Sequence, residues 1–211
     1  LGICHLLNLV YFSGSNRHDI LFHMQTNKYL RNGIIVGLFL ALFSPIIVTN
    51  SLFFPFFTGK NFFFRILVEI VTALYLVLVF RDRSFLPRKS PLLLSMIAFV
   101  SVVFIADIFS VNVHKSFWSN FERMEGFISL VHFFLYFIIL SSTIKTKEIW
   151  DRFWNFIVGI GLYASFYGLL QFFGLVANVQ GGSRLDGPLG NTAYFAGYLI
   201  FLVALSSYYF L

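Results

Sequence analysis

Six long apolar stretches separated by short polar connections dominate this sequence. They lie at about 34–53, 62–80, 92–110, 127–143, 153–175 and 192–211. A helix needs about 20 apolar residues to cross a hydrocarbon core roughly 30 Å thick. A spanning segment must also satisfy its backbone hydrogen bonds without water, and a helix does so within itself. The pattern therefore predicts an all-α, multi-pass transmembrane helical bundle of about six helices.

The composition excludes an ordinary soluble domain. Hydrophobic residues make up 58% of the chain and charged residues 11%, whereas a soluble domain carries about 25% charged residues. The net charge of +6 does not indicate a nucleic-acid partner, because Lys and Arg stand in short clusters between apolar stretches. The single cysteine, Cys4, excludes an internal disulfide and a paired-cysteine metal or redox motif.

The basic residues divide unequally between alternate connections. One side holds ten, namely Arg17, Lys28, Arg31, Arg81, Arg83, Arg88, Lys89, Lys145, Lys147 and Arg152. The other side holds five, namely Lys60, Arg65, Lys115, Arg123 and Arg184. Because cytoplasmic loops carry the excess of Lys and Arg, we expect the ten-residue side and the N-terminus to be cytoplasmic.

Both ends of the sequence raise an expectation about its extent. The first methionine is Met24, which opens a short basic tail before the first apolar stretch. We expect Met24 to be the native start and residues 1–23 to be a mis-annotated upstream extension. The last stretch reaches Leu211 without a polar flank, so we expect a truncated piece of a longer protein, with 24–211 forming its N-terminal part.

Ionisable groups at membrane depth are costly and mark candidate functional positions. Glu69, Asp107 and His132 all fall toward the predicted outer side. Arg65 and Glu69 stand four residues apart, which allows an ion pair on one helix face. We expect His132 to be a hydrogen-bonded bundle residue rather than a catalytic base. The Gly33–Gly37 spacing matches a helix-dimerisation motif but also occurs in ordinary membrane helices.

Two predicted outer loops carry the remaining polar residues of interest. The segment 116–126 holds Glu122, Arg123 and Glu125 among aromatic residues, and fits either an interfacial turn or an outward-facing polar pocket. In the segment 181–199, the glycines at 181, 182, 187 and 190 with Pro188 predict a constrained loop that a capped helix follows. A helix N-terminus with an arginine just before it favours an anion. The alternative is a plain re-entry turn with one exposed arginine.

Four segments resemble the N-terminal half of bacterial O-antigen ligase and O-antigen polymerase family proteins. They are FFPFFTGKNFFFR (53–65), SFWSNFERMEG (116–126), YGLLQ (167–171) and RLDGPLGNTAYFAGYL (184–199). The resemblance covers nearly all of residues 24–211. Its most specific part is the family's arginine, glycine and helix-opening asparagine, which Arg184, Gly187 and Asn191 match. Thr192 departs from the family, which often has proline there.

The resemblance implies a glycosyltransferase of the bacterial inner (plasma) membrane that serves the cell envelope. Such an enzyme moves a glycan from a polyprenyl-diphosphate carrier to a lipid or protein acceptor at the periplasmic face. No cofactor and no metal are implied, because the lipid diphosphate is itself the leaving group. The family's catalytic residues lie in a second half, so the catalytic residues here stay unassigned and this 211-residue chain alone is expected to be inactive.

Within this chain, Arg184 and Arg123 are the predicted ligands of the substrate diphosphate, since a guanidinium presents a planar fork of donors to phosphate oxygens. The predicted supporting residues are Asn191, Gly187, Glu122 and Glu125. Ligase, polymerase and protein-glycosylating subtypes stay open. A membrane transporter or flippase is the alternative function, although the internal repeat typical of transporters is not found. A non-catalytic membrane scaffold is the third.

The charge distribution predicts the topology of two connections. Single cysteines at Arg88→Cys and Ser119→Cys, in a Cys4→Ser background, should react differently with a membrane-impermeant maleimide in intact spheroplasts. We expect labelling at position 119 and none at position 88 until the membrane is permeabilised. The opposite pattern would contradict the predicted orientation.

Overall fold

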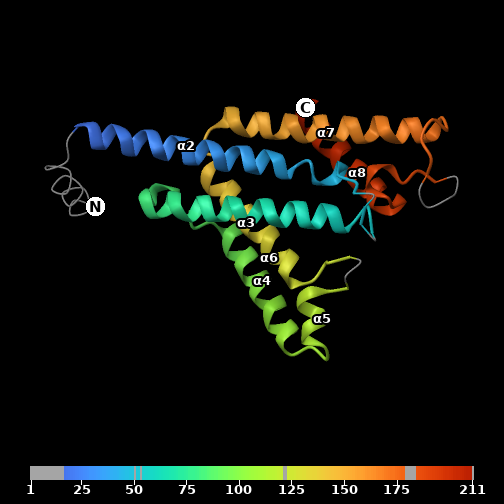
Figure 1. Ribbon diagram of the computed structural model, residues 1–211, viewed down its shortest axis with the longest axis horizontal. Coiled ribbons are helices and arrows are strands. Elements are labelled where there is room, and N and C mark those ends of the chain that lie inside the picture. Colours follow the sequence, from blue (N-terminus) through green and yellow to red (C-terminus); the bar gives the residue numbers. More distant parts are fainter. Residues whose placement is uncertain (1–16, 50, 53, 121–122, 179–183, 211) are drawn as a thin grey trace.

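The computed structural model is a bundle of helices (Figure 1). It describes residues 17–49, 51–52, 54–120, 123–178 and 184–210. Every regular element in these ranges is helical, which confirms the predicted all-α class. The α-helices are α2 (Arg17–Ala41), α3 (Thr58–Arg81), α4 (Pro91–Ile108), α5 (Val113–Trp118), α6 (Phe127–Thr143), α7 (Lys147–Phe172) and α8 (Thr192–Phe210). Three 3-10 turns join them, η1 (Ser44–Ile46), η2 (Arg83–Phe85) and η3 (Gly187–Leu189).

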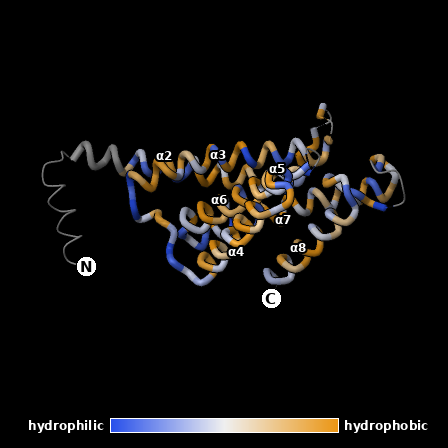
Figure 2. Tube along the Cα trace, turned by 90° about the horizontal axis from the view of Figure 1, so that it is seen from below, coloured by the Kyte–Doolittle hydropathy of each residue, from blue (hydrophilic) through white to orange (hydrophobic). Residues whose placement is uncertain are grey.

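Five stretches of the described chain are helical, long and apolar enough to cross a membrane. They are Met24–Ile46, Thr58–Arg81, Pro91–Ile108, Lys147–Phe172 and Thr192–Tyr209. The sixth apolar helix, α6, is shorter at 17 residues. Hydrophobic colouring follows these helices in Figure 2, and the connection between α3 and α4 is largely hydrophilic. The chain thus has the character of a transmembrane helical protein.

The first predicted stretch, 34–53, is helical only in part. Helix α2 already begins at Arg17 and ends at Ala41. Pro45 lies in the first positions of the turn η1, where its missing N–H is no loss. The chain then reverses, and the N–H of Thr49 donates to the carbonyl of Pro55 at 3.0 Å. The other five stretches correspond to α3, α4, α6, α7 and α8, although α7 begins at Lys147 rather than near 153.

Helices α2, α3 and α7 run roughly along one another, whereas α4 and α6 cross them obliquely (Figure 1). The main core lies between α2, α3 and α6, where Ile34, Leu38, Leu78 and Ile139 are at most 1% exposed. Two further contacts extend the core. The Tyr136 hydroxyl of α6 donates to the α2 backbone at 2.9 Å, and phenylalanine rings join α2 to α7.

Gly33 and Gly37 pack α2 against α3 within the chain. A Cβ added to Gly37 would overlap the side chain of Val71, and one added to Gly33 would lie 3.9 Å from Leu74. The absence of side chains lets the two helix backbones approach closely. In this structure Gly37 therefore serves contact between two helices of one chain, whereas Gly33 is exposed.

One end of the bundle, which we call the Lys145 end (residues 81–90 and 144–147), gathers basic residues. Lys145 Nζ donates to the carbonyl of Ser84 at 2.9 Å and lies 3.8 Å from the centre of the Phe85 ring. Burial is the main cause of the lowered pKa of Lys145. Asp82 opposes that shift, and Arg88 and Arg31 add to it. These contacts tie the connection before α7 to the one after α3.

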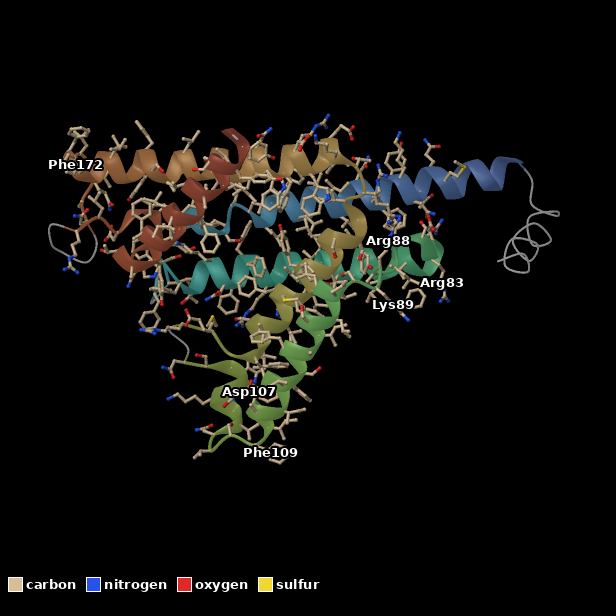
Figure 3. All side chains as sticks on the ribbon, turned by 180° about the vertical axis from the view of Figure 1, so that it is seen from behind. Arg83, Arg88, Lys89, Asp107, Phe109 and Phe172 are labelled. Carbon is tan, nitrogen blue, oxygen red and sulfur yellow. The ribbon has the colours of Figure 1, made fainter. Side chains whose placement is uncertain are left out.

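Helix α4 contributes no buried residue to the bundle. Arg83, Arg88 and Lys89 lie toward its N-terminal end, and Asp107 and Phe109 lie at its far end (Figure 3). Phe104 packs on the rings of Phe117 and Phe127, and most of the other α4 side chains are exposed, which leaves them free to face lipid in a membrane. Basic residues mark one end of this helix and an acidic residue marks the other.

The close approach of α2 and α3 predicts a size limit at one position. Gly37→Leu should lower the free energy of unfolding by about 1–3 kcal/mol, because the new side chain overpacks the contact with Val71. The midpoint of thermal unfolding in detergent measures this effect. Gly197→Leu is the matched control, since no atom lies within 4 Å of its added Cβ. Equal midpoints for the two variants would contradict the predicted contact.

Candidate functional site

The first two turns of α3 hold together the end of the bundle opposite to Lys145. Lys60 Nζ donates to the Pro188 carbonyl at 2.7 Å, which ties α3 to the turn η3. The next residue, Asn61, donates from Nδ2 to the Arg123 carbonyl at 2.9 Å. We call this region the Lys60 end (residues 54–61, 123–126 and 184–191). The connections that the charge distribution assigned to the side with fewer basic residues meet here.

The loop around Arg123 is held in a strained conformation. Met124 has a positive φ of 54°, a left-handed conformation that is unfavourable for a residue with a side chain. Its carbonyl accepts a hydrogen bond from Arg65 Nη2 at 2.7 Å and one from Ser129 Oγ at 2.5 Å. Arg65 Nη2 also lies 2.6 Å from Ser129 Oγ. Buried donors thus hold the backbone directly beside Arg123.

The loop after Arg184 is fixed by a glutamine from α7. Gln171 Nε2 donates to Asp186 Oδ1 at 2.6 Å, and Gln171 Oε1 accepts the Gly187 N–H at 2.8 Å. Asp186 is 0% exposed and Gln171 is 5% exposed. A buried carboxylate needs such partners, since burial without them is costly. Gln171 therefore sets the position at which this loop enters α8.

Two glycines in this loop occupy conformations that favour glycine. Gly187 has a φ of 57° and Gly190 a φ of 69°. A Cβ at Gly187 would meet the Phe195 ring at 2.6 Å, and a Cβ at Gly190 would collide with Phe56. Asn191 then caps α8, with its Oδ1 accepting from the N–H groups two and three residues ahead at 2.9 and 3.3 Å. The predicted helix cap is confirmed, and so is the constrained loop over residues 184–190; Gly181 and Gly182 lie outside the described residues.

The structure places the predicted ligands at the Lys60 end. Arg123 and Arg184 are both exposed, each on a loop that α3 anchors through a neighbouring residue. In the described part of the chain no hydrogen bond or ion pair of the Arg184 guanidinium is found. Glu125 is exposed and lines a cavity beside Lys60. Glu122 lies outside the described residues.

The cap of α8 changes one detail of the predicted anion site. Asn191 already accepts from the first free N–H groups of the helix, so those groups are engaged before any ligand arrives. The helix dipole still favours a nearby negative charge. An anion at this end would therefore bind mainly through arginine side chains, with the dipole as a supporting field.

The Arg65–Glu69 ion pair that the spacing allows is not formed, and a polar contact between α3 and α6 is found in its place. Arg65 contacts the loop and Ser129, whereas Glu69 Oε1 lies 3.3 Å from His132 Nε2. His132 Nδ1 lies 2.7 Å from the Ile128 carbonyl, which only accepts, so Nδ1 carries a hydrogen. With the ring hydrogen on Nδ1, both Nε2 and a Glu69 carboxylate oxygen can only accept. A hydrogen bond between them therefore requires a second hydrogen, on Nε2 or on the Glu69 carboxyl group. His132 is thus a hydrogen-bonded bundle residue, as predicted.

Two adjoining cavities open at the Lys60 end, each of about 400 Å³. Both contact Lys60, Asn61, Phe133 and Leu189. The first also contacts Glu125 and Ser129, and the second is otherwise lined mainly by apolar side chains of α2, α3, α7 and α8. No three His, Cys, Asp or Glu side chains of the described chain are grouped to hold a metal ion.

Sequence reasoning did not single out Lys60, Asn61, Gln171 or Asp186. Gln171 gave a usable signal, because a glutamine in a membrane helix needs an internal partner. Asp186 stands between a leucine and a glycine in a loop that reads as solvent-exposed. The partners of Lys60 and Asn61 lie 128 and 62 residues away, so no local pattern indicated them.

The hydrogen bonds from Gln171 to the loop after Arg184 predict the effect of replacing this residue. Gln171→Leu should lower the free energy of unfolding by about 2–4 kcal/mol, because it removes two hydrogen bonds at a buried carboxylate and backbone N–H. Amide hydrogen exchange at residues 185–190 should rise, and the midpoint of thermal unfolding should fall. Gln25→Leu, on the exposed face of α2, is the control. Unchanged exchange in the loop would show that Gln171 does not hold it.

Comparison with models of protein families, with curated proteins and with solved structures finds no match.

Proposed function

We propose that this chain is part of a membrane glycan transferase of the O-antigen ligase or polymerase kind. It would act at the periplasmic face of a bacterial inner membrane, with the Lys60 end outward and the N-terminus in the cytoplasm. One observation carries the proposal. The exposed Arg123 and Arg184 belong to separate loops that consecutive residues of α3 hold at one end of the membrane helices.

The chemistry of the proposed substrate fits two positioned arginines. In glycan transfer an acceptor oxygen bonds to the anomeric carbon, and the bond from that carbon to the diphosphate oxygen breaks. Negative charge then grows on the departing polyprenyl diphosphate. A guanidinium fixed near that group stabilises the transition state more than the ground state. The acceptor and the glycan are not specified by the residues of this end.

The contacts of the segments that follow the two arginines support this role. Gln171 and two glycines with positive φ hold the segment after Arg184, and Arg65 with Ser129 holds the one after Arg123. When the loops are ordered before the substrate arrives, binding costs less conformational entropy. Asn191 and Gly187 thus support the proposed site through the backbone.

A transporter or flippase is the second candidate, favoured by the Glu69–His132 contact between α3 and α6. Paired carboxylate and imidazole groups inside membrane helices form proton relays in transporters. Proton-driven movement of a lipid-linked glycan across proteoliposome membranes, without transfer to any acceptor, would favour this function over the transferase.

The transferase proposal predicts a graded loss of turnover in the full-length protein. Arg184→Ala should slow glycan transfer on the order of 100-fold, by analogy with other positioned electrostatic donors. Arg184→Lys should recover only part of it, since lysine keeps the charge but lacks the planar fork. Arg123→Ala should show a smaller loss. Transfer from radiolabelled polyprenyl-diphosphate glycan is measured at equal membrane abundance.

Lys115→Ala is the matched control, because Lys115 is an exposed cation of the same side on the separate helix α5. It should transfer glycan at the wild-type rate. If Arg184→Ala also does so at limiting and at saturating donor, Arg184 is only a loop residue.

A further inference from the structure

The two cavities beside Lys60 differ in the side chains that line them. The cavity that we call the polar cavity contacts Lys60, Asn61, Glu125 and Ser129 along with aromatic rings. Its neighbour, the apolar cavity, extends between α2, α7 and α8 and contacts residues such as Pro45, Ile157 and Ile160. Lys60 and Asn61 stand where the two meet. An occupant of both would need one charged part and one hydrocarbon part.

Lys60 and Glu125 line the polar cavity without pairing with each other. Within the described chain, the ion pair joins His132 and Glu69 instead. Lys60 Nζ is held by the Pro188 carbonyl at 2.7 Å. An ammonium group carries three N–H donors, so two of them remain to meet a ligand. The Lys60 ammonium and the Glu125 carboxylate thus both line the polar cavity and are not paired with each other.

Asn61 adds an acceptor next to these charges. Its Nδ2 is engaged with the Arg123 carbonyl at 2.9 Å. No hydrogen bond of its Oδ1 to another described residue is found, so this oxygen is available to a donor. The polar cavity therefore offers N–H donors on Lys60, and acceptors on Glu125 and Asn61.

This arrangement suits a ligand that carries both charges. A headgroup with a phosphate alone would meet Lys60 but would also be repelled by Glu125. A quaternary ammonium has no N–H to donate to a carboxylate. A phosphate joined to a primary ammonium satisfies both sides, since each charged group then makes a charge-assisted hydrogen bond.

We infer that these cavities bind one zwitterionic phospholipid whose headgroup carries a primary ammonium, as in phosphatidylethanolamine. Its phosphate accepts from Lys60, its ammonium donates to Glu125 and to Asn61 Oδ1, and one acyl chain lies in the apolar cavity. The inference goes beyond the proposed transferase activity and does not depend on it. The cavities lie among helices long and apolar enough to cross a membrane, so membrane lipid would reach them.

The test is lipid selectivity of the purified full-length protein in mixed micelles. Dioleoyl phosphatidylethanolamine, phosphatidylglycerol and phosphatidylcholine are added at equal mole fraction. The rise in the unfolding midpoint reports binding to the folded state, and native mass spectrometry counts retained lipid. We expect phosphatidylethanolamine to bind about tenfold more tightly than the other two, as one charge-assisted hydrogen bond allows. Equal binding of the three lipids by the wild-type protein would overturn the inference.

Two variants separate the two ends of the headgroup. Lys60→Met should weaken phosphatidylethanolamine about tenfold. Glu125→Gln removes the repulsion of an anionic headgroup, so phosphatidylglycerol should then bind as well as phosphatidylethanolamine. Lys115→Met and Glu148→Gln, exposed charges outside these cavities, should keep the wild-type preference. If the Glu125→Gln protein still binds phosphatidylethanolamine more tightly than phosphatidylglycerol, Glu125 does not bind the ammonium group.

Discussion

The Lys60 end depends on the hydrogen bonds that polar side chains in the first three turns of α3 donate to two loops. Lys60, Asn61 and Arg65 each donate to a carbonyl in a different part of two loops, and Glu69 reaches His132 one turn further on. Away from water an unsatisfied carbonyl costs free energy comparable to a lost hydrogen bond. Three residues of one apolar helix thereby hold both loops against the bundle, and a fourth, Glu69, contacts α6.

This anchoring links the architecture to the proposed chemistry. The side chains of Arg123 and Arg184 are exposed, whereas buried partners hold the backbone of Met124 and of Gly187, one and three residues further on. An exposed cation on a rigid backbone can meet an anion at the membrane surface with little reorganisation. The polar and apolar cavities lie against the same turns of α3, so a bound lipid would contact the helix that anchors both loops.

The opposite end of the bundle, the Lys145 end, is held by fewer polar contacts. Lys145 contacts the backbone and an aromatic ring of the preceding connection, and the other basic residues there are mostly exposed. Between the ends, Gly37 sets the separation of α2 and α3, and α4 lies at the edge of the bundle with most of its surface exposed. Close contacts between helices thus stabilise the interior of the bundle, and hydrogen bonds of polar side chains stabilise its two ends.

Several features of this protein follow from its sequence alone. Apolar stretches of spanning length determine the helical class, because a bilayer leaves the backbone no other partner within one segment. Gly187, Gly190 and Asn191 indicate their loop and cap because left-handed turns and helix N-termini select these residue types locally. The Glu69–His132 contact and the hydrogen bonds of Gln171 to Asp186 and Gly187 were decided by the tertiary structure. Each depends on which side chain another helix brings within about 3 Å, the range of a hydrogen bond, and residue spacing along one helix carries no record of that.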